Sequence, residues 1–130
     1  MPPARPSILL ISPDLMLTSR VAGLVAGMAG QLETLSLCTA TPKGEAFDLV
    51  LIDLGNLRPA PGELLTQLRT TLSRQPLPPI VAFGPHVHKD RLQAALDAGA
   101  HDAVSRGELL GDFASCIARW CDSVEGGSPT

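Results

Sequence analysis

The fold is decided by the segment Asp48-Leu49-Val50-Leu51-Ile52-Asp53-Leu54. A short apolar run closed by charged residues is typical of a central strand in a parallel sheet that is covered on both faces. The carboxyl ends of such strands form the edge at which doubly wound α/β proteins bind ligands. We therefore expect Asp53 at the ligand-binding edge of the sheet.

Strand and helix patterns alternate along the rest of the chain. Apolar runs predict strands, and apolar residues at helical spacing predict helices between them. The predicted strands are residues 7–12, 32–37, 48–54, 80–83 and 103–105. The predicted helices are residues 15–28, 64–73, 91–98 and 109–124. Short connections between these elements imply right-handed crossovers and a mostly parallel sheet with helices on both faces.

The segment 39–46, between the second and third predicted strands, is too short for a full crossover helix. It contains Pro42 and Gly44, which both disfavour a helix. We predict a loop with one turn there, so that the second helix of the pattern is shortened or lost.

Three glycines, Gly23, Gly27 and Gly30, lie within or at the end of the first predicted helix. None of them follows a strand with the Gly-x-Gly-x-x-Gly spacing of a dinucleotide-binding loop. We interpret them as positions that permit close packing of this helix against the sheet.

A chain of 130 residues with 45% hydrophobic content is sufficient for one buried core. We expect one domain over residues 1–124 and a disordered tail over residues 125–130. The formal net charge is −3 and Lys and Arg are scattered, so binding to nucleic acid is not expected. No apolar run reaches the roughly 20 residues that cross a bilayer. Because a signal-peptide pattern is also absent, we expect a cytoplasmic protein.

Cys38, Cys116 and Cys121 are odd in number and match no metal-binding spacing. In a reducing compartment they are expected to be buried, inert thiols. No serine or cysteine stands in a recognisable nucleophile motif, so nothing points to a hydrolase.

Two histidines, His86 and His88, stand close together in a predicted loop. Asp90 or His101 could complete a metal set with them, but two loop histidines define no coordination geometry. We favour loop histidines that form hydrogen bonds or face solvent.

The chain resembles the CheY-like receiver domain of bacterial response regulators in four segments, which are residues 8–14, 48–54, 79–84 and 98–106. The last is the most telling, because receivers place an Ala-Gly-Ala-Asp-like turn before the fifth strand, which ends in a conserved lysine. Here the turn is Ala98-Gly99-Ala100-His101-Asp102, and Arg106 stands at the lysine position. The resemblance implies a flavodoxin-like (βα)5 sandwich whose five parallel strands have the order 2-1-3-4-5.

The resemblance also assigns the residues of the receiver phosphorylation site. Asp53 matches the phosphoacceptor in place and in type. The acidic pair that holds Mg²⁺ falls on Ser12 and Pro13, with Asp14 one residue too late. This implies at most a weak Mg²⁺ site with Asp14 and Asp53 as ligands, and no other cofactor.

Other receiver positions carry different residues. Gly84 replaces the hydroxyl residue that binds the phosphoryl group, Ala103 replaces an aromatic residue, and Gly107 replaces a proline. Arg106 keeps a positive charge that is expected to pair with Asp53 or with a phosphate, although its planar fork differs from an ammonium. Phosphoryl transfer would lose most of its electrostatic stabilisation. We therefore expect a degenerate pseudo-receiver with impaired phosphorylation, not an enzyme.

The favoured hypothesis is a stand-alone signalling module that docks a protein through residues 91–98, 103–105 and the last helix. Candidate partners are a histidine kinase, an output protein or a second copy in a homodimer. The candidate interface residues are Arg91, Asp97, Arg119 and Trp120, and Trp120 is alternatively a core residue.

Two alternatives involve the carboxyl edge of the sheet. In the first, the chain is an active phosphorelay receiver that accepts a phosphoryl group on Asp53. In the second, it senses a small molecule in a crevice at this edge. The residues expected to line that crevice are Ser12, Asp53, Gly84, His86 and Arg106.

Overall fold

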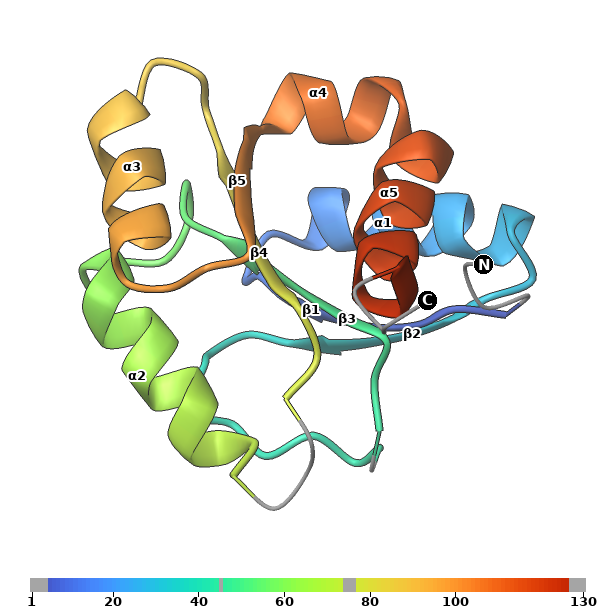
Figure 1. The fold of residues 1–130 in the computed structure, drawn as a ribbon, viewed down its shortest axis with the longest axis horizontal. Coiled ribbons are helices and arrows are strands. Elements are labelled where there is room, and N and C mark those ends of the chain that lie inside the picture. Colours follow the sequence, from blue (N-terminus) through green and yellow to red (C-terminus); the bar gives the residue numbers. More distant parts are fainter. Residues whose placement is uncertain (1–4, 45, 74–76, 127–130) are drawn as a thin grey trace.

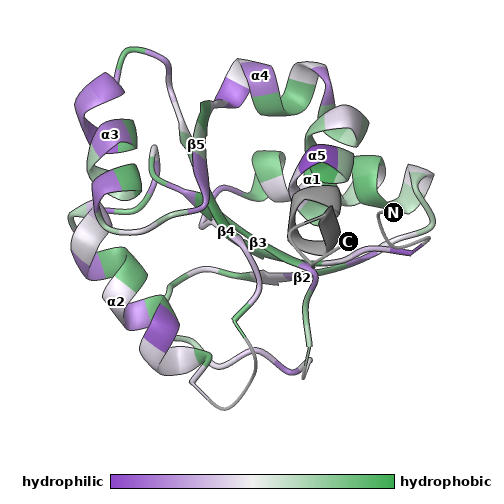
Figure 2. Ribbon diagram, viewed as in Figure 1, coloured by the Kyte–Doolittle hydropathy of each residue, from purple (hydrophilic) through white to green (hydrophobic). Residues whose placement is uncertain are grey.

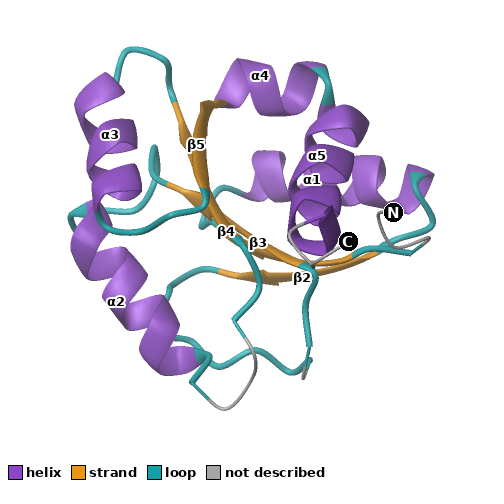
Figure 3. Ribbon diagram, viewed as in Figure 1, coloured by secondary structure: helices purple, strands orange, loops and turns teal. Residues whose placement is uncertain are grey.

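A five-stranded parallel sheet forms the central layer of the computed structural model, which describes residues 5–44, 46–73 and 77–126 (Figures 1 and 3). The strands are β1 (Ser7–Ile11), β2 (Gln31–Leu35), β3 (Leu49–Asp53), β4 (Ile80–Gly84) and β5 (Asp102–Ser105). Their order is β2-β1-β3-β4-β5, and every neighbouring pair is parallel. The predicted fold class and strand order are confirmed.

Helices cover both faces of the sheet. They are α1 (Leu15–Gly27), α2 (Pro61–Thr71), α3 (Lys89–Asp97), α4 (Arg106–Gly111) and α5 (Phe113–Gly126). α1, α4 and α5 contribute to one hydrophobic core (the α1–α5 core), and α2 and α3 contribute to the other (the α2–α3 core). No helix in the described part of the chain is long and apolar enough to span a membrane.

The strands divide their side chains between these two cores. In β1, Ile8 and Leu10 belong to the α1–α5 side, and Leu9 and Ile11 belong to the α2–α3 side. All five residues of β3 are buried. In Figure 2 the centre of the sheet around β3 is hydrophobic, whereas α2 and α3 carry hydrophilic as well as hydrophobic residues. A strand buried on both faces has no polar alternation, which explains the continuous apolar run that identified β3.

The connection from β2 to β3 contains no helix among its described residues, as predicted. Glu33 of β2 orders it by accepting two backbone hydrogen bonds, from Lys43 at 2.6 Å and Gly44 at 2.8 Å. A carboxylate thus satisfies the backbone groups that a helix would otherwise have paired internally.

The prediction of a single last helix over residues 109–124 is wrong, because the segment forms two helices. Ser105 accepts a hydrogen bond from the Glu108 N–H and so starts α4 already at Arg106. Asp112 then has φ −147° and ψ 55°, which is not helical, and separates α4 from α5. α5 extends through Gly126, so the predicted tail begins inside this helix, and residues 127–130 lie outside the described residues.

The packing role predicted for the glycines of α1 is wrong for Gly23 and Gly27. Both are exposed, and a Cβ at either position would meet no atom within 4 Å. Gly30 is different, because a Cβ there would lie 2.7 Å from the carbonyl oxygen of Pro6. Only the glycine after the helix is therefore required for close packing.

The predicted start of the second helix is also wrong. α2 begins at Pro61, three residues before the predicted residue 64. Proline fits the first helical position because its φ is already helical and its missing N–H has no partner there. The prediction of residues 64–73 therefore missed the first turn of this helix.

The three cysteines are buried, as predicted, and they form no disulfide among the described residues. Burial raises the pKa of the Cys38 thiol to about 11. Burial also raises the pKa of Cys116, against the opposing influence of Arg119. Both thiols therefore remain protonated at neutral pH and are poor nucleophiles.

Candidate functional site

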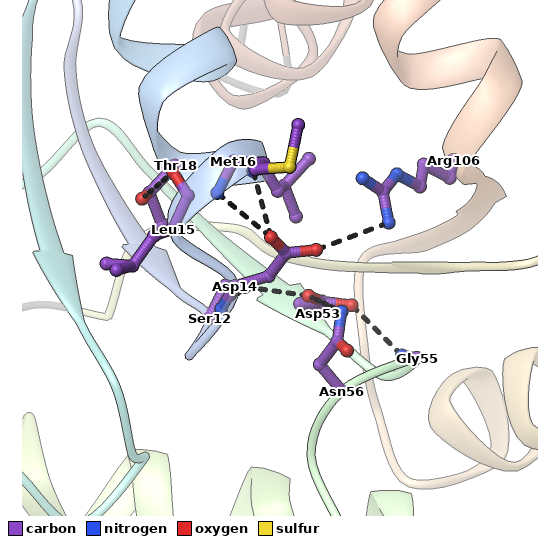
Figure 4. A network of polar contacts seen from close by, with 10 residues as sticks. Ser12, Asp14, Leu15, Met16, Thr18, Asp53, Gly55, Asn56 and Arg106 are labelled. Carbon is purple, nitrogen blue, oxygen red and sulfur yellow. Dashed lines mark hydrogen bonds and ion pairs between the residues drawn. The ribbon is translucent and has the colours of Figure 1, made fainter.

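The candidate site lies where β1 and β3 end at the carboxyl edge of the sheet (Figure 4). Asp53 is the last residue of β3, and Ser12 directly follows β1. The two strands are paired, with Ile11 opposite Ile52, so the residues that follow these positions are adjacent. Ser12 and Asp53 are the buried polar residues of the described chain, at 3% and 1% exposure.

Hydrogen-bond donors surround the Asp53 carboxylate. Its Oδ2 accepts from the Ser12 hydroxyl at 2.7 Å and from the Asn56 side-chain amide at 2.7 Å. Its Oδ1 accepts from the Gly55 N–H at 3.0 Å. A buried carboxylate needs such donors, because an unsatisfied one would carry a large desolvation cost. Neutral donors therefore satisfy Asp53, and among the described residues no cation is paired with it.

Asp14 serves as the N-cap of α1. Its Oδ1 accepts from the backbone N–H groups of Met16 at 3.0 Å and Leu17 at 3.1 Å. Ser12 adds a further local contact, since its Oγ accepts from the Asp14 N–H at 3.1 Å. The acidic residue that stands one position late in the receiver pattern is thus used to start a helix.

Arg106 is paired with Asp14, so the expected pairing with Asp53 is wrong. Its Nη1 lies 3.7 Å from Asp14 Oδ2, and both side chains are partly exposed. The physical reason is the early start of α4, which makes Arg106 a first-turn residue facing the N-terminus of α1 (Figure 4). A pair of this exposure contributes about 0–1 kcal/mol to stability.

The donor set at this edge does not fit Mg²⁺. Magnesium requires near-octahedral oxygen coordination, usually with one or two free carboxylates. Asp53 already accepts three hydrogen bonds, and Asp14 caps α1. Within the described residues, no three His, Cys, Asp or Glu side chains are grouped so that they could hold a metal ion.

His86, His88 and His101 are exposed. The metal set considered for His86 and His88 with Asp90 or His101 does not form in the described structure, since these residues are not grouped. The exposure of His86 and His88 agrees with the favoured interpretation, in which they are loop histidines that form hydrogen bonds or face solvent.

Gly84 ends β4 beside the site. A Cβ there would lie 3.5 Å from the Leu54 Cβ, which is ordinary van der Waals contact. A Cβ would therefore be tolerated, so this position has no steric need for glycine. Ala103 is half-buried in β5 and packs against the α2–α3 core.

Two contributors to the site were not predicted from the sequence. Asn56 donates directly to Asp53, and its only sequence signal is its place three residues after the strand end. Arg91 was predicted as an interface residue, but its Nη2 donates to the carbonyl oxygens of Leu54, Leu57 and Pro59 at 2.9–3.2 Å. It therefore fixes the loop after β3, and no local pattern indicated this contact.

The other candidate interface residues differ in exposure. Asp97 is exposed and accepts from Gln93, and Arg119 is 54% exposed and lies near Asp102 and Glu108. Trp120 is 1% exposed, and its indole N–H donates to Asp102 at 2.8 Å. Trp120 is therefore a core residue and cannot anchor an interface in this conformation.

The topology and the position of Asp53 define the class of fold, which is that of response regulator receiver domains. No family model matches the sequence, and no curated protein matches it. Solved structures do match over most of the chain, at sequence identities that establish the fold alone.

Three of these structures illustrate the likeness. A receiver domain protein from Clostridium thermocellum has a TM-score of 0.71 and 15% identity, covering 92% of this chain and 97% of its own. The non-phosphorylated HemR receiver domain from Leptospira biflexa has a TM-score of 0.66 and 20% identity, with 97% of each chain covered. The receiver domain of a sensor histidine kinase from Pseudomonas aeruginosa, solved with magnesium in its active-site cleft, has a TM-score of 0.68 and 14% identity, covering 92% of this chain and 99% of its own.

Proposed function

We propose that this chain is a receiver-fold module of two-component signalling that binds a protein partner without being phosphorylated. The proposal rests on the state of Asp53, which is 1% exposed and accepts hydrogen bonds from Ser12, Asn56 and Gly55. A carboxylate oxygen that attacks a phosphoryl group must be accessible to the donor. Here both oxygens are already engaged by the protein.

The charges around Asp53 also favour this proposal. Phosphoryl transfer is catalysed mainly by positioned cations that stabilise the charge on the transferring group. Arg106, the cation at the receiver lysine position, is paired with Asp14, and the remaining donor set does not fit Mg²⁺. The alternative of an active phosphorelay receiver therefore lacks the electrostatic groups that it needs.

Beryllofluoride, which mimics a phosphoryl group on aspartate, tests this proposal. We expect that Mg²⁺, beryllium and fluoride cause no Asp53-dependent change in the NMR spectrum at residues 12, 84 and 106. The matched control is Asp53→Asn, which keeps the size of the side chain. A receiver with an intact acidic pair serves as positive control. Saturable shifts in the wild type that disappear in Asp53→Asn would restore the phosphorelay hypothesis.

The surface at the β5 edge of the sheet is the proposed docking site. It carries Asp97 of α3 on one side and Arg119 of α5 on the other, both exposed. β5 is an edge strand, so this side of the sheet is not covered by a further strand of the described chain. A second copy of the chain is the first partner to test.

Charge reversal tests this surface. We expect Arg119→Glu to weaken self-association by roughly tenfold or more, because a fully desolvated charge pair contributes strongly to binding. The matched control is Arg20→Glu on the exposed side of α1, which should associate like the wild type. Sedimentation equilibrium measures the association. A wild-type chain that is monomeric at all concentrations would exclude the homodimer, and equal association of both variants would exclude this surface.

A further inference from the structure

A cavity of about 440 Å³ opens at the carboxyl edge of the sheet, beside the Asp53 site. Three chain segments line it, namely Pro13 after β1, residues 36–37 after β2 and residues 56–59 after β3. Known small-molecule sites begin at roughly 300 Å³, so the volume suffices for a small ligand. The residues differ from the crevice expected from the sequence, which was placed on the β4 side of Asp53.

The position of the cavity is the one at which open α/β sheets bind ligands. In the sheet, β2 and β3 lie on opposite sides of β1. The chain therefore passes from β1 to β2 on one side and returns past β1 to reach β3 on the other. The loops after β1 and β3 therefore diverge and leave a crevice outside the strand ends. Pro13 and residues 56–59 belong to these two loops.

The wall formed by residues 56–59 is fixed by the rest of the protein. Arg91 donates to the carbonyl oxygens of Leu57 and Pro59, at 2.9 and 3.2 Å. Asn56 donates to the buried Asp53, and Leu57 is 5% exposed. A preformed wall reduces the entropy that a ligand would lose by ordering it.

The lining has an uneven chemistry. Pro13, Leu37, Leu57 and Pro59 supply apolar surface, and Leu37 is 57% exposed although it is a large hydrophobic residue. Arg58 is the charged residue of the lining, and it makes no hydrogen bond or ion pair within the described part of the chain. Among the described residues, no carboxylate lines the cavity. The complement of this surface is an apolar body with one anionic group.

We propose that this cavity binds a small amphipathic carboxylate. The hydrocarbon part packs between Leu37 and Pro59, and the carboxylate accepts hydrogen bonds from the Arg58 guanidinium, whose fork matches a carboxylate. A small molecule is favoured over a protein segment because the volume lies within the range of known small-molecule sites. This site is additional to the proposed docking surface, and neither depends on the other.

Decanoate is the probe, titrated into the full chain below its micelle concentration and followed by NMR. We expect saturable shifts at residues 36–37 and 56–59. Decanol, which has the same hydrocarbon and no charge, should bind more weakly. Arg58→Gln should weaken decanoate binding by roughly tenfold or more, since it removes a charge-assisted hydrogen bond.

Matched variants distinguish binding in the cavity from nonspecific binding elsewhere on the surface. Arg20→Gln removes an exposed cation elsewhere and should leave decanoate binding unchanged. Leu37→Ser should weaken the binding of both decanoate and decanol, whereas Leu96→Ser, at another exposed leucine, should not. The spectrum of the remaining residues checks that each variant is folded.

Three results would overturn the proposal. They are the absence of shifts at millimolar decanoate, shifts that map away from the cavity, and equal decanoate affinity of wild type and Arg58→Gln. The beryllofluoride experiment is independent, because it reports on Asp53 and uses no amphipathic ligand. Failure of one proposal therefore leaves the other unaffected.

Discussion

The Ser12→Asp variant is expected to lose about 3–5 kcal/mol of unfolding free energy in Mg²⁺-free buffer at neutral pH, the cost of an uncompensated buried charge. The Ser12 hydroxyl now donates to Asp53 Oδ2 at 2.7 Å, and both residues are buried. The substitution replaces this donor with a second carboxylate. Two negative groups at this separation repel each other, and no cationic side chain of the described residues is paired with Asp53.

Magnesium should reverse much of this loss. The variant gains the first acidic position of the receiver pattern, next to Asp53, and thus a pair of carboxylates of the kind that Mg²⁺ binds. At about 100 times its dissociation constant, a ligand specific for the folded state adds about 2.7 kcal/mol. Chemical denaturation with and without Mg²⁺ measures the effect.

The control for this prediction is Ser12→Asn, which is close to aspartate in size and carries no charge. It retains a donor toward Asp53, so it should lose less stability and show no response to Mg²⁺. If Ser12→Asp were as stable as the wild type without Mg²⁺, the Ser12–Asp53 hydrogen bond would not hold the carboxylate as described. A loss that Mg²⁺ leaves unchanged would show that Asp53 is unavailable to metal even beside a second carboxylate.

The sheet could be predicted from the sequence because burial on both faces leaves a strong local signal. β3 and β4 are continuous apolar runs, and all ten of their residues are buried. Asp14 caps α1, and aspartate between a strand and a helix is a residue type that favours this position. That the described residues between β2 and β3 form no helix followed from the length of the segment and from Pro42 and Gly44.

The partners of the charged residues could not be predicted in this way. The sequence placed Arg106 at the position of the receiver lysine. The direction of its side chain depends on where α4 starts, and Ser105 sets this start by accepting one hydrogen bond from the Glu108 N–H. Arg91 looked like a surface cation at helical spacing, yet it binds three carbonyls from a distant loop. Such long side chains reach partners that are far apart in sequence, so spacing says little about them.

The same limit applies to the cavity. Its lining comes from three loops, and only the strand order brings Pro13, Leu37 and Asn56 together. The sequence indicated that the carboxyl edge was the place for a ligand. It did not show that Asp53 would be satisfied by Asn56 and that the open space would lie on the β2 side.

Trp120→Ala is expected to lower the free energy of unfolding by about 3–5 kcal/mol, the usual cost of removing a large buried aromatic side chain. Trp120 is 1% exposed and packs in the α1–α5 core. The total free energy of unfolding of a small domain is only about 5–15 kcal/mol, so the variant should be near the limit of folding. Because the chain has one tryptophan, unfolding must be followed by far-UV circular dichroism.

Trp120→Phe separates packing from hydrogen bonding at this position. It keeps most of the ring volume and removes the N–H that donates to Asp102 at 2.8 Å, so it should lose about 1–3 kcal/mol. Arg119 limits this loss, because its guanidinium lies 3.8 Å from the same carboxylate and 5.4 Å from the ring centre. If Trp120→Ala instead unfolded like the wild type and abolished self-association, the indole would be an interface anchor. The core role assigned to Trp120 would then be wrong, and the docking surface at the β5 edge would have to include it.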